Sequence, residues 1–459
     1  MPGVSVPGEA TPGRASPRRR FVVDLSPLRE SRQFRLLFWG QAVSIVGRQF
    51  TVVAASFEVY QLTHSTLMVG VLSLAQLGPL LLFSLLGGSL ADAMDRRRLL
   101  LAVQVFMAAT SAGLAVNATM SHPTVWAIFV CTAASAAFSA VDSPARTAIV
   151  PVVVAPDRFP AASALQQIAF QGSQAVGPLL AGVVIARLDI AAAYWIDVVS
   201  FGLATIFLIA MHAMPPVGGG TRVGLTSMGE GLRFLRSRRA LQGTFIVDLN
   251  AMLFGMPRAL FPEMALHVFR GGGQVYGALS AAPGIGAVIG ALTSGWVGHV
   301  RRQGRAVLYA VAAWGVAIAV FGATRWLPLA LVMLAVAGAA DVVSAVFRNT
   351  ILQLSVPDRL RGRLSAVHIA VVTGGPRLGD AEAGLVAAIS NTQVSAVSGG
   401  LACVVGTAFI ARFMPQLTHW TPDLAAPDTG MPSDDAAAGP GSGPAKDVRA
   451  SPGPGQAAL

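Results

Sequence analysis

Twelve long apolar segments follow one another along this chain, and they constrain its fold more than any other feature. Most of them reach the length of about 20 residues that an α-helix needs to cross a bilayer. The predicted helices span residues 34–61, 66–91, 98–119, 124–149, 160–187, 190–212, 241–267, 274–299, 305–323, 327–352, 364–389 and 394–413. The pattern predicts an all-α membrane protein with twelve transmembrane helices.

The composition indicates that the bilayer, and not water, surrounds this chain. Only 12% of its 459 residues are charged and 54% are hydrophobic, whereas soluble domains carry about twice that share of charge. The formal charge of +11 comes from basic residues in the loops, which is typical of topology signals and not of a nucleic-acid groove. Cys131 and Cys403 lie within apolar segments, and two cysteines are too few for a disulfide scaffold or a thiolate metal site.

The loop arginines predict the orientation of the helices. Fifteen arginines lie in loops that follow even-numbered helices, and only Arg187, Arg270 and Arg325 lie in loops that follow odd-numbered ones. Basic residues favour the cytoplasmic side, so both termini are expected in the cytoplasm of a bacterial-type cell, beneath its inner membrane. The fifteen are Arg96, Arg97, Arg98, Arg158, Arg222, Arg233, Arg236, Arg238, Arg239, Arg301, Arg302, Arg305, Arg359, Arg361 and Arg363.

The loops also predict the domain organisation. The longest interruption, residues 213–240, is expected to be a cytoplasmic linker between two six-helix halves, 34–212 and 241–414. Residues 1–33 are expected to form a cytoplasmic tail with a short helix along the membrane surface. Residues 415–459, mostly small residues and proline, are expected to be a disordered cytoplasmic tail.

Three short sequences recur in the same order in the two halves. They are Gly-x-Leu-Ser at 70–73 and 277–280, Pro-Asp-Arg at 156–158 and 357–359, and Gly-Pro at 177–178 and 375–376. Parallel repeats of this kind build transporters whose binding site lies between the halves, near the middle of the membrane.

A glycine, an acid and a basic run occupy the turn between the second and third predicted helices. Small residues such as Gly88 let helices approach closely, and Arg96 and Arg97 favour the cytoplasmic side. Asp92, at the membrane edge, needs a cationic partner, for which Arg146 is the natural candidate. We therefore expect these five residues to form a gating motif, although an ordinary basic loop with a chance aspartate is the alternative.

This turn resembles the signature between helices two and three of the major facilitator superfamily, although Ala93 stands where that family has arginine and Asp95 where it has glycine. Residues 34–41 and 59–63 are similar to the subgroup that contains the enterobactin exporters. The resemblance spans residues 26–414. It implies two pseudo-symmetric six-helix bundles, the major facilitator fold, and an exporter driven by an ion gradient.

A glycine-proline pair lies in the fifth predicted helix. Gly177 and Pro178 resemble the signature of proton-driven exporters in the same superfamily, with Ala181 in place of one usual glycine. Proline removes one backbone donor and permits a bend. A proline kink without functional meaning is the alternative.

Ionisable residues within the apolar segments are functional candidates, because charge inside a bilayer is costly. The resemblance implies that helices one, four, seven and ten line a central cavity. The candidates for the cavity or for proton coupling are Arg48, Asp142, Asp248, Asp341, Arg348, Arg377, Asp380 and Glu382. Asp142, Asp341 and Asp380 are the leading candidates for the coupling group. The alternative is that these charges form ion pairs that only hold the bundle together. Asp142 and Arg146, for example, are one helical turn apart and can pair directly. Glu58, near the outer end of the first helix, is expected to reach interfacial water.

We expect a secondary active transporter, specifically a proton-coupled exporter of a small amphipathic molecule (a siderophore, antibiotic or drug) by rocker-switch alternating access. An importer of a nutrient or lipid is the alternative on the same fold, and a polytopic membrane enzyme is the alternative of another class. The chain has no phosphate-binding Gly-x-x-x-x-Gly-Lys motif and its only lysine is Lys446, so we expect a proton gradient and no cofactor. The expected partners are a small-molecule substrate and the lipid bilayer, with no nucleic acid, and the protein is expected to be a monomer.

Overall fold

The computed structural model describes residues 24–213, 233–236, 238–356 and 358–421. All regular structure in this part of the chain is helical. The long helices are α2 (Arg32–Thr63), α3 (Thr66–Ala93), α4 (Arg96–Thr119), α5 (Val125–Val153), α6 (Phe159–Arg187), α7 (Ile190–Ile209), α9 (Arg239–Phe254), α11 (Gly273–Thr293), α12 (Gln303–Ala323), α13 (Leu327–Ser355), α14 (Asp358–Ile389) and α15 (Thr392–Phe413).

Eleven helices of the described chain are long and apolar enough to cross a membrane. The remaining long helix, α14, is the eleventh in chain order and is 32 residues long, but it carries Arg377, Asp380 and Glu382 in its second half. The predicted all-α membrane fold is therefore confirmed, and most helix ends lie within a few residues of the predicted ones.

Polar side chains in the loops cap the N-termini of several of these helices. Asp95 accepts a hydrogen bond from the backbone N–H of Arg98 at 2.9 Å and so caps α4. Asp189 and Asn391 cap α7 and α15 in the same way. Such caps satisfy backbone N–H groups that the first helical turn leaves free.

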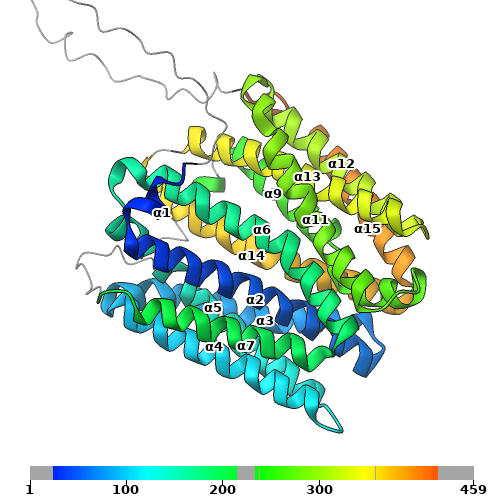
Figure 1. Ribbon diagram of the computed structural model, residues 1–459. Coiled ribbons are helices and arrows are strands. Elements are labelled where there is room, and N and C mark those ends of the chain that lie inside the picture. Colours follow the sequence, from blue (N-terminus) through cyan, green and yellow to red (C-terminus); the bar gives the residue numbers. More distant parts are fainter. Residues whose placement is uncertain (1–23, 214–232, 237, 357, 422–459) are drawn as a thin grey trace, which may run out of the picture.

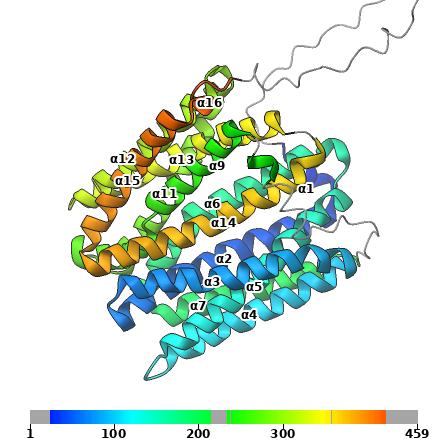
Figure 2. The same ribbon diagram turned by 180° about the vertical axis from the view of Figure 1, so that it is seen from behind.

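The long helices pack as two bundles, α2–α7 and α9–α15, which lie side by side in Figures 1 and 2. In the first bundle α2 packs against α7 and α3 against α5, and in the second α12 packs against α13 and α15. Between the bundles, α6 packs against α11 and α3 against α14. The second and fifth helices of each half thus form the seam, as pseudo-twofold symmetry requires.

Glycines bring the two bundles into backbone contact at one end of the seam. A Cβ atom on Gly182 would lie 2.5 Å from the carbonyl oxygen of Gly273 and 2.7 Å from Cα of Gly277. A Cβ atom on Gly70 would lie 2.5 Å from the carbonyl oxygen of Asp380. Both contacts lie toward the end where α3 begins and α6 ends, the end that the loop arginines predict to be outside. Small residues permit this close packing.

The seventh membrane segment is broken, so the prediction of one helix over 241–267 is wrong. Helix α9 ends at Phe254, and three short pieces follow: η2 (Arg258–Leu260), α10 (Phe261–Glu263) and η3 (Met264–Val268). Pro257 cannot donate a backbone hydrogen bond, and proline interrupts a helix for that reason.

Two side chains satisfy backbone groups that the break leaves free. The indole Nε1 of Trp314 donates to the carbonyl oxygen of Gly255 at 2.7 Å. The backbone N–H of Ala259 donates to Oδ1 of Asp380 at 3.1 Å. Irregular backbone at membrane depth requires such partners, and here they come from α12 and α14.

The expectation of a disordered tail from residue 415 is wrong for its first residues. Helix α16 (Pro415–Thr418) packs against α9 and α12. Leu417 is fully buried and Trp420 is 4% exposed, because two large apolar side chains are more stable out of water. The predicted tail beyond residue 421 lies outside the described chain.

The N-terminal tail contains the expected short helix, α1 (Ser26–Glu30), which packs against α2 and α6. Arg158, in the turn η1 (Pro156–Arg158), contacts Glu30 at 3.1 Å and Asp24 at 3.7 Å. Residues 1–23 of this tail, and 214–232 of the predicted linker, lie outside the described part.

Candidate functional site

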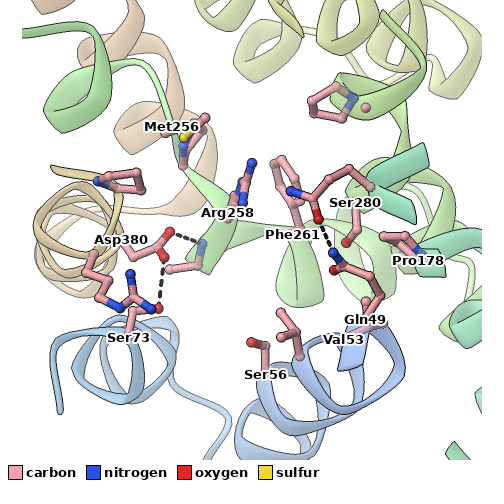
Figure 3. Close-up of a pocket in the computed structure, with 18 of the residues that line it drawn as sticks. Gln49, Val53, Ser56, Ser73, Pro178, Met256, Arg258, Phe261, Ser280 and Asp380 are labelled. Carbon is pink, nitrogen blue, oxygen red and sulfur yellow. Dashed lines mark hydrogen bonds between the residues drawn. The ribbon is translucent and has the colours of Figure 1, made fainter. Parts of the chain in front are cut away.

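A cavity of about 430 Å³ lies between the two bundles. Side chains of α2, α3, α5 and α6 face those of α11, α12, α13, α14 and the broken segment 255–261. Figure 3 shows Gln49 and Ser56 on one side and Arg258, Asp380 and Ser280 on the other. The cavity has the size and the mixed polar and apolar lining of small-molecule sites.

Asp380 is the most connected acid at this cavity. It is buried on α14, and its Oδ2 accepts a hydrogen bond from the Ser73 hydroxyl on α3 at 2.8 Å. Its Oδ1 accepts the hydrogen bond from Ala259, and both bonds are drawn in Figure 3. One carboxylate therefore holds together the first bundle, the second bundle and the break in the seventh segment.

Three arginines line the cavity without a carboxylate partner among the described side chains. Nη1 of Arg48 donates to the hydroxyl of Ser139 at 2.8 Å, and Nη1 of Arg377 donates to the carbonyl oxygen of Thr373 at 2.6 Å. The Arg258 side chain is exposed to the cavity and, within the described chain, makes no hydrogen bond or ion pair. Arg48 and Arg377 are thus two predicted cavity residues that the structure places at the cavity.

Asp341 also lines the cavity as predicted, but Asp248, Arg348 and Glu382 do not. Asp248 and Arg348 lie inside the second bundle, where their side chains are 2% and 5% exposed. Oδ1 of Asp248 and Nη1 of Arg348 are 2.6 Å apart and form an ion pair, but their geometry is not that of a hydrogen bond. Nη2 of Arg348 lies 3.7 Å from Oδ1 of Asp341. The carboxylates of α9 and α13 thus share one buried arginine.

The expected pairing of Asp142 and Arg146 is confirmed. Asp142 was predicted as a cavity residue, but it is not among the residues that line the cavity. Nε of Arg146 lies 2.7 Å from Oδ2 of Asp142 within the first bundle. Nη1 and Nη2 of Arg146 are buried without a hydrogen-bond partner among the described side chains. The surroundings of Gly88 and the side chain of Asp92 lie outside what the structure describes, so the contact between Asp92 and Arg146 stays a prediction.

Two of the three arginines of the predicted gating motif, Arg96 and Arg97, bind backbone oxygens of the first bundle. Arg96 donates to the carbonyl oxygen of Ala148 on α5 at 2.8 Å. Arg97 donates to the carbonyl oxygens of Leu208 and Ile209, at 3.0 and 2.6 Å. The carbonyl oxygen of Leu208 also accepts the backbone N–H of Met211 at 3.2 Å. Because Ile209 is the last residue of α7, Arg97 fixes the start of α4 to the end of α7.

The glycine-proline pair of α6 faces both the cavity and the seam. A Cβ atom on Gly177 would lie 2.5 Å from Cβ of Gln49, and Pro178 lines the cavity. The helix continues through Pro178. Because proline has no N–H, the carbonyl oxygen of Gln174, four residues before Pro178, has no hydrogen-bond partner within the helix. Helix α11 packs closely against this oxygen, since a Cβ atom on Gly284 would lie 2.5 Å from it.

Arg258 is a cavity residue that the sequence reasoning missed. A signal was present, since Gly255 and Pro257 interrupt an apolar segment, and such interruptions point to binding sites in transporters with repeated halves. Gln49 and Gln174, which are joined by a hydrogen bond across α2 and α6, were also missed, because neutral amides give no charge signal within an apolar segment.

Two buried carboxylates of the first bundle were missed or misplaced. Asp197 on α7 accepts hydrogen bonds from Thr51 at 2.6 Å and Ser111 at 2.7 Å. Glu58 does not reach interfacial water as expected, because it is 3% exposed and accepts a hydrogen bond from the Tyr194 hydroxyl at 2.6 Å. Both acids lie away from the cavity and hold helices of one bundle together.

Aromatic contacts cross the seam near the glycine contacts. The rings of Phe57 and Tyr276 stack with centroids 5.2 Å apart, and the Tyr60 hydroxyl lies 3.2 Å from Nδ1 of His267. The end of the seam that is predicted to be outside is therefore packed both by backbone and by side chains.

Known proteins are similar to this chain in sequence and in fold. The family described as transmembrane secretion effector matches residues 22–443. The enterobactin exporter EntS of Citrobacter koseri is 27% identical over 412 residues, which cover 90% of this chain and 99% of that protein. The exporter of the same name from Escherichia coli K12 is 26% identical over 415 residues, 90% of this chain and all of that protein (100%).

Solved transporter structures have the same fold at low sequence identity. A bacterial homologue of the human lysosomal transporter Spinster, inward-facing and unoccupied, has a TM-score of 0.65 at 14% identity, over 85% of this chain and 98% of that one. A D-xylose-proton symporter has a TM-score of 0.65 at 13% identity, over 84% and 99%. These likenesses confirm the arrangement of two pseudo-symmetric helix bundles.

Proposed function

This chain belongs to the family of transmembrane secretion effectors within the major facilitator superfamily, and we propose that it is a proton-coupled exporter of small amphipathic molecules. At the coarser level it is a multi-pass membrane protein and a secondary transporter of a small molecule, not an enzyme.

Export is the proposed direction because the curated relatives that align over nearly their whole length are named as exporters of enterobactin. At 26–27% identity we carry over the direction and a general cargo class, a siderophore, antibiotic or drug-like compound. The proposed location is the inner membrane of a bacterial cell, as a monomer with both termini in the cytoplasm and without a nucleic-acid partner. The arginine-rich loops support that orientation.

Rocker-switch alternating access is the proposed mechanism, and the cavity at the seam is the observation that carries it. The bundles contact each other mainly through α6 with α11 and α3 with α14, so one bundle can rock against the other around the cavity. The backbone contacts of Gly70 and Gly182 close the end that we assign to the outside. Opening that end requires these glycine contacts to separate.

Asp380 is the proposed proton-coupling group. Its ionised carboxylate accepts hydrogen bonds from Ser73 and Ala259, and charge strengthens such bonds. When the carboxylate takes up a proton, that strengthening is lost and the bond across the seam weakens. Proton binding would therefore favour separation of α3 from α14, which is what coupling requires.

A gate on the cytoplasmic side is proposed at the motif between α3 and α4. The buried Nη1 and Nη2 of Arg146, which lack a hydrogen-bond partner among the described side chains, support its role as the cationic partner of Asp92. Arg96 and Arg97 would hold that gate to α5 and α7.

Everted membrane vesicles test the proposal. Compounds that become toxic in a deletion strain would be offered to vesicles that contain the protein. ATP- or respiration-driven acidification of the lumen should drive accumulation of the cargo, and a protonophore should abolish it. Accumulation in right-side-out vesicles instead would identify an importer of a nutrient or lipid.

A further inference from the structure

Five arginines lie inside or between the two bundles of the described chain, and they fall into two groups that differ in their partners. Arg146 and Arg348 lie inside the bundles, and each contacts a carboxylate within 2.7 Å. Arg48, Arg258 and Arg377 line the cavity, and none of them has a carboxylate within ion-pair distance in the described chain. A charge at membrane depth is costly without a partner, so the second group needs a function.

The carboxylates around the cavity interact with these three arginines only over longer distances, beyond ion-pair contact in the described chain. Asp380 uses both carboxylate oxygens for hydrogen bonds to Ser73 and Ala259. Asp341 lies 3.7 Å from Arg348, which is not part of the cavity lining. Asp197, behind Arg48, accepts its hydrogen bonds from hydroxyl groups.

The free donors of these arginines lie where a ligand would contact them. Arg258 projects from the break in the seventh segment, and Figure 3 shows its side chain between Asp380 and Phe261. Arg377 lines the cavity from α14; its Nε is buried and its Nη1 donates to Thr373, so Nη2 is the donor that it can offer to a ligand. Arg48 uses one donor for Ser139 and reaches the cavity from the opposite bundle.

We propose that the cavity binds an amphipathic anion, with its carboxylate or other planar anionic group held by the guanidinium groups of Arg258, Arg377 and Arg48. A guanidinium presents two parallel N–H donors that match a carboxylate. The apolar body of the ligand would lie against Phe261, Trp314 and other apolar lining residues. This inference rests on the proposed export function and assigns a charge to its cargo.

The ligand would also join the two bundles. Arg48 belongs to α2 in the first bundle, whereas Arg258 and Arg377 belong to the second. An anion that contacts both bundles therefore binds more tightly when the bundles are close around it than when they are apart. A ligand needs such a difference in affinity between two states in order to shift a conformational equilibrium.

Equilibrium binding to the purified protein in lipid nanodiscs tests the inference. The probes are naphthoate, naphthamide and naphthamidine, which share one ring system and differ in charge, and quenching of tryptophan fluorescence reports binding because Trp314 lines the cavity. We expect naphthoate to bind about tenfold more tightly than naphthamide, and naphthamidine most weakly, because a charge-assisted hydrogen bond contributes at least that much.

Variants assign the binding to the arginines. Arg258→Gln and Arg48→Gln should each weaken naphthoate binding about tenfold and leave naphthamide binding unchanged, and Arg258→Lys should have an intermediate effect. Arg325→Gln, in the exposed loop between α12 and α13, is the matched control and should change nothing. If Arg258→Gln does not elute as a folded monodisperse protein, Arg48→Gln and Arg258→Lys decide the result.

Equal affinity for the three probes, preference for the amidine, undetectable naphthoate binding, or arginine variants without effect would overturn the inference. These results leave the proposed function standing if the vesicles still show gradient-driven export. Selective naphthoate binding without any gradient-driven transport would instead reject the export function and retain an anion site.

Discussion

The hydroxyl of Ser73 and the carboxylate of Asp380 form a 2.8 Å hydrogen bond between the two halves of this transporter. The residues are 307 positions apart in the sequence and belong to α3 and α14, one of the two helix pairs of the seam. The same carboxylate accepts the backbone N–H of Ala259. A change at one group therefore affects the contact between the bundles and the break in the seventh segment together.

Replacing Asp380 with asparagine should uncouple transport from the proton gradient. Asparagine keeps the size and one oxygen acceptor, but it cannot take up a proton. We expect gradient-driven accumulation in proteoliposomes to fall by about tenfold or more, while exchange of cargo across the membrane without a gradient continues.

The matched control for this variant is Glu382→Gln, on the same helix but outside the cavity lining. It should leave both gradient-driven accumulation and exchange unchanged. Full accumulation by Asp380→Asn would exclude Asp380 as the coupling group.

Adding one methyl group at Gly182 should prevent closure of the end assigned to the outside. The new Cβ would lie 2.5 Å from the carbonyl oxygen of Gly273, closer than atoms pack, so the α6–α11 contact must separate. We expect Gly182→Ala to lower the transport rate and to raise the reactivity of a cysteine placed at His64 toward a membrane-impermeant maleimide.

Gly202→Ala serves as the control for the glycine variant, since a Cβ there meets no atom within 4 Å. It should transport cargo and react with maleimide as the His64→Cys parent does. If Gly182→Ala and Gly202→Ala behave alike, the glycine contact does not control the closed end.

The sequence predicts the helices of this fold well because length and apolar content suffice for a membrane crossing. It does not predict which way each helix faces. Membrane helices such as α9 and α13 are apolar on most of their surface, so there is no amphipathic period to indicate a rotation. Asp248 and Arg348 were therefore placed on the right helices but at the wrong site.

The break in the seventh segment was missed for a related reason. Residues on both sides of Gly255 are apolar, so hydropathy joins them into one segment. The partners that stabilise the break, Trp314 and Asp380, come from α12 and α14, and no local pattern relates them to residues 255–259. Arg258 was overlooked because its position depends on that break.

Replacing Trp314 with phenylalanine should destabilise the break. The variant keeps an aromatic ring in a site that is 2% exposed but leaves the carbonyl of Gly255 without its 2.7 Å donor. We expect a loss of about 1 kcal/mol in the free energy of unfolding and faster hydrogen exchange at residues 255–260. Trp126→Phe, at a position that is 79% exposed, should show neither effect, and equal exchange rates in both variants would contradict the assignment.

Removing one partner of the Asp248–Arg348 ion pair should be the costliest of these substitutions. Asp248→Asn leaves the buried guanidinium of Arg348 with only Asp341, whose Oδ1 is 3.7 Å away. Breaking a buried pair costs about 3–5 kcal/mol, so the free energy of unfolding in mixed micelles should fall by about 3 kcal/mol, the low end of that range, because Asp341 remains. The double variant Asp248→Asn with Arg348→Met should regain most of this loss, since it removes the unpaired charge.

Glu30→Gln is the control for this prediction. It breaks an exposed pair with Arg158 and should cost less than about 1 kcal/mol. A similar cost for Asp248→Asn and Glu30→Gln would show that the buried pair does not stabilise the second bundle.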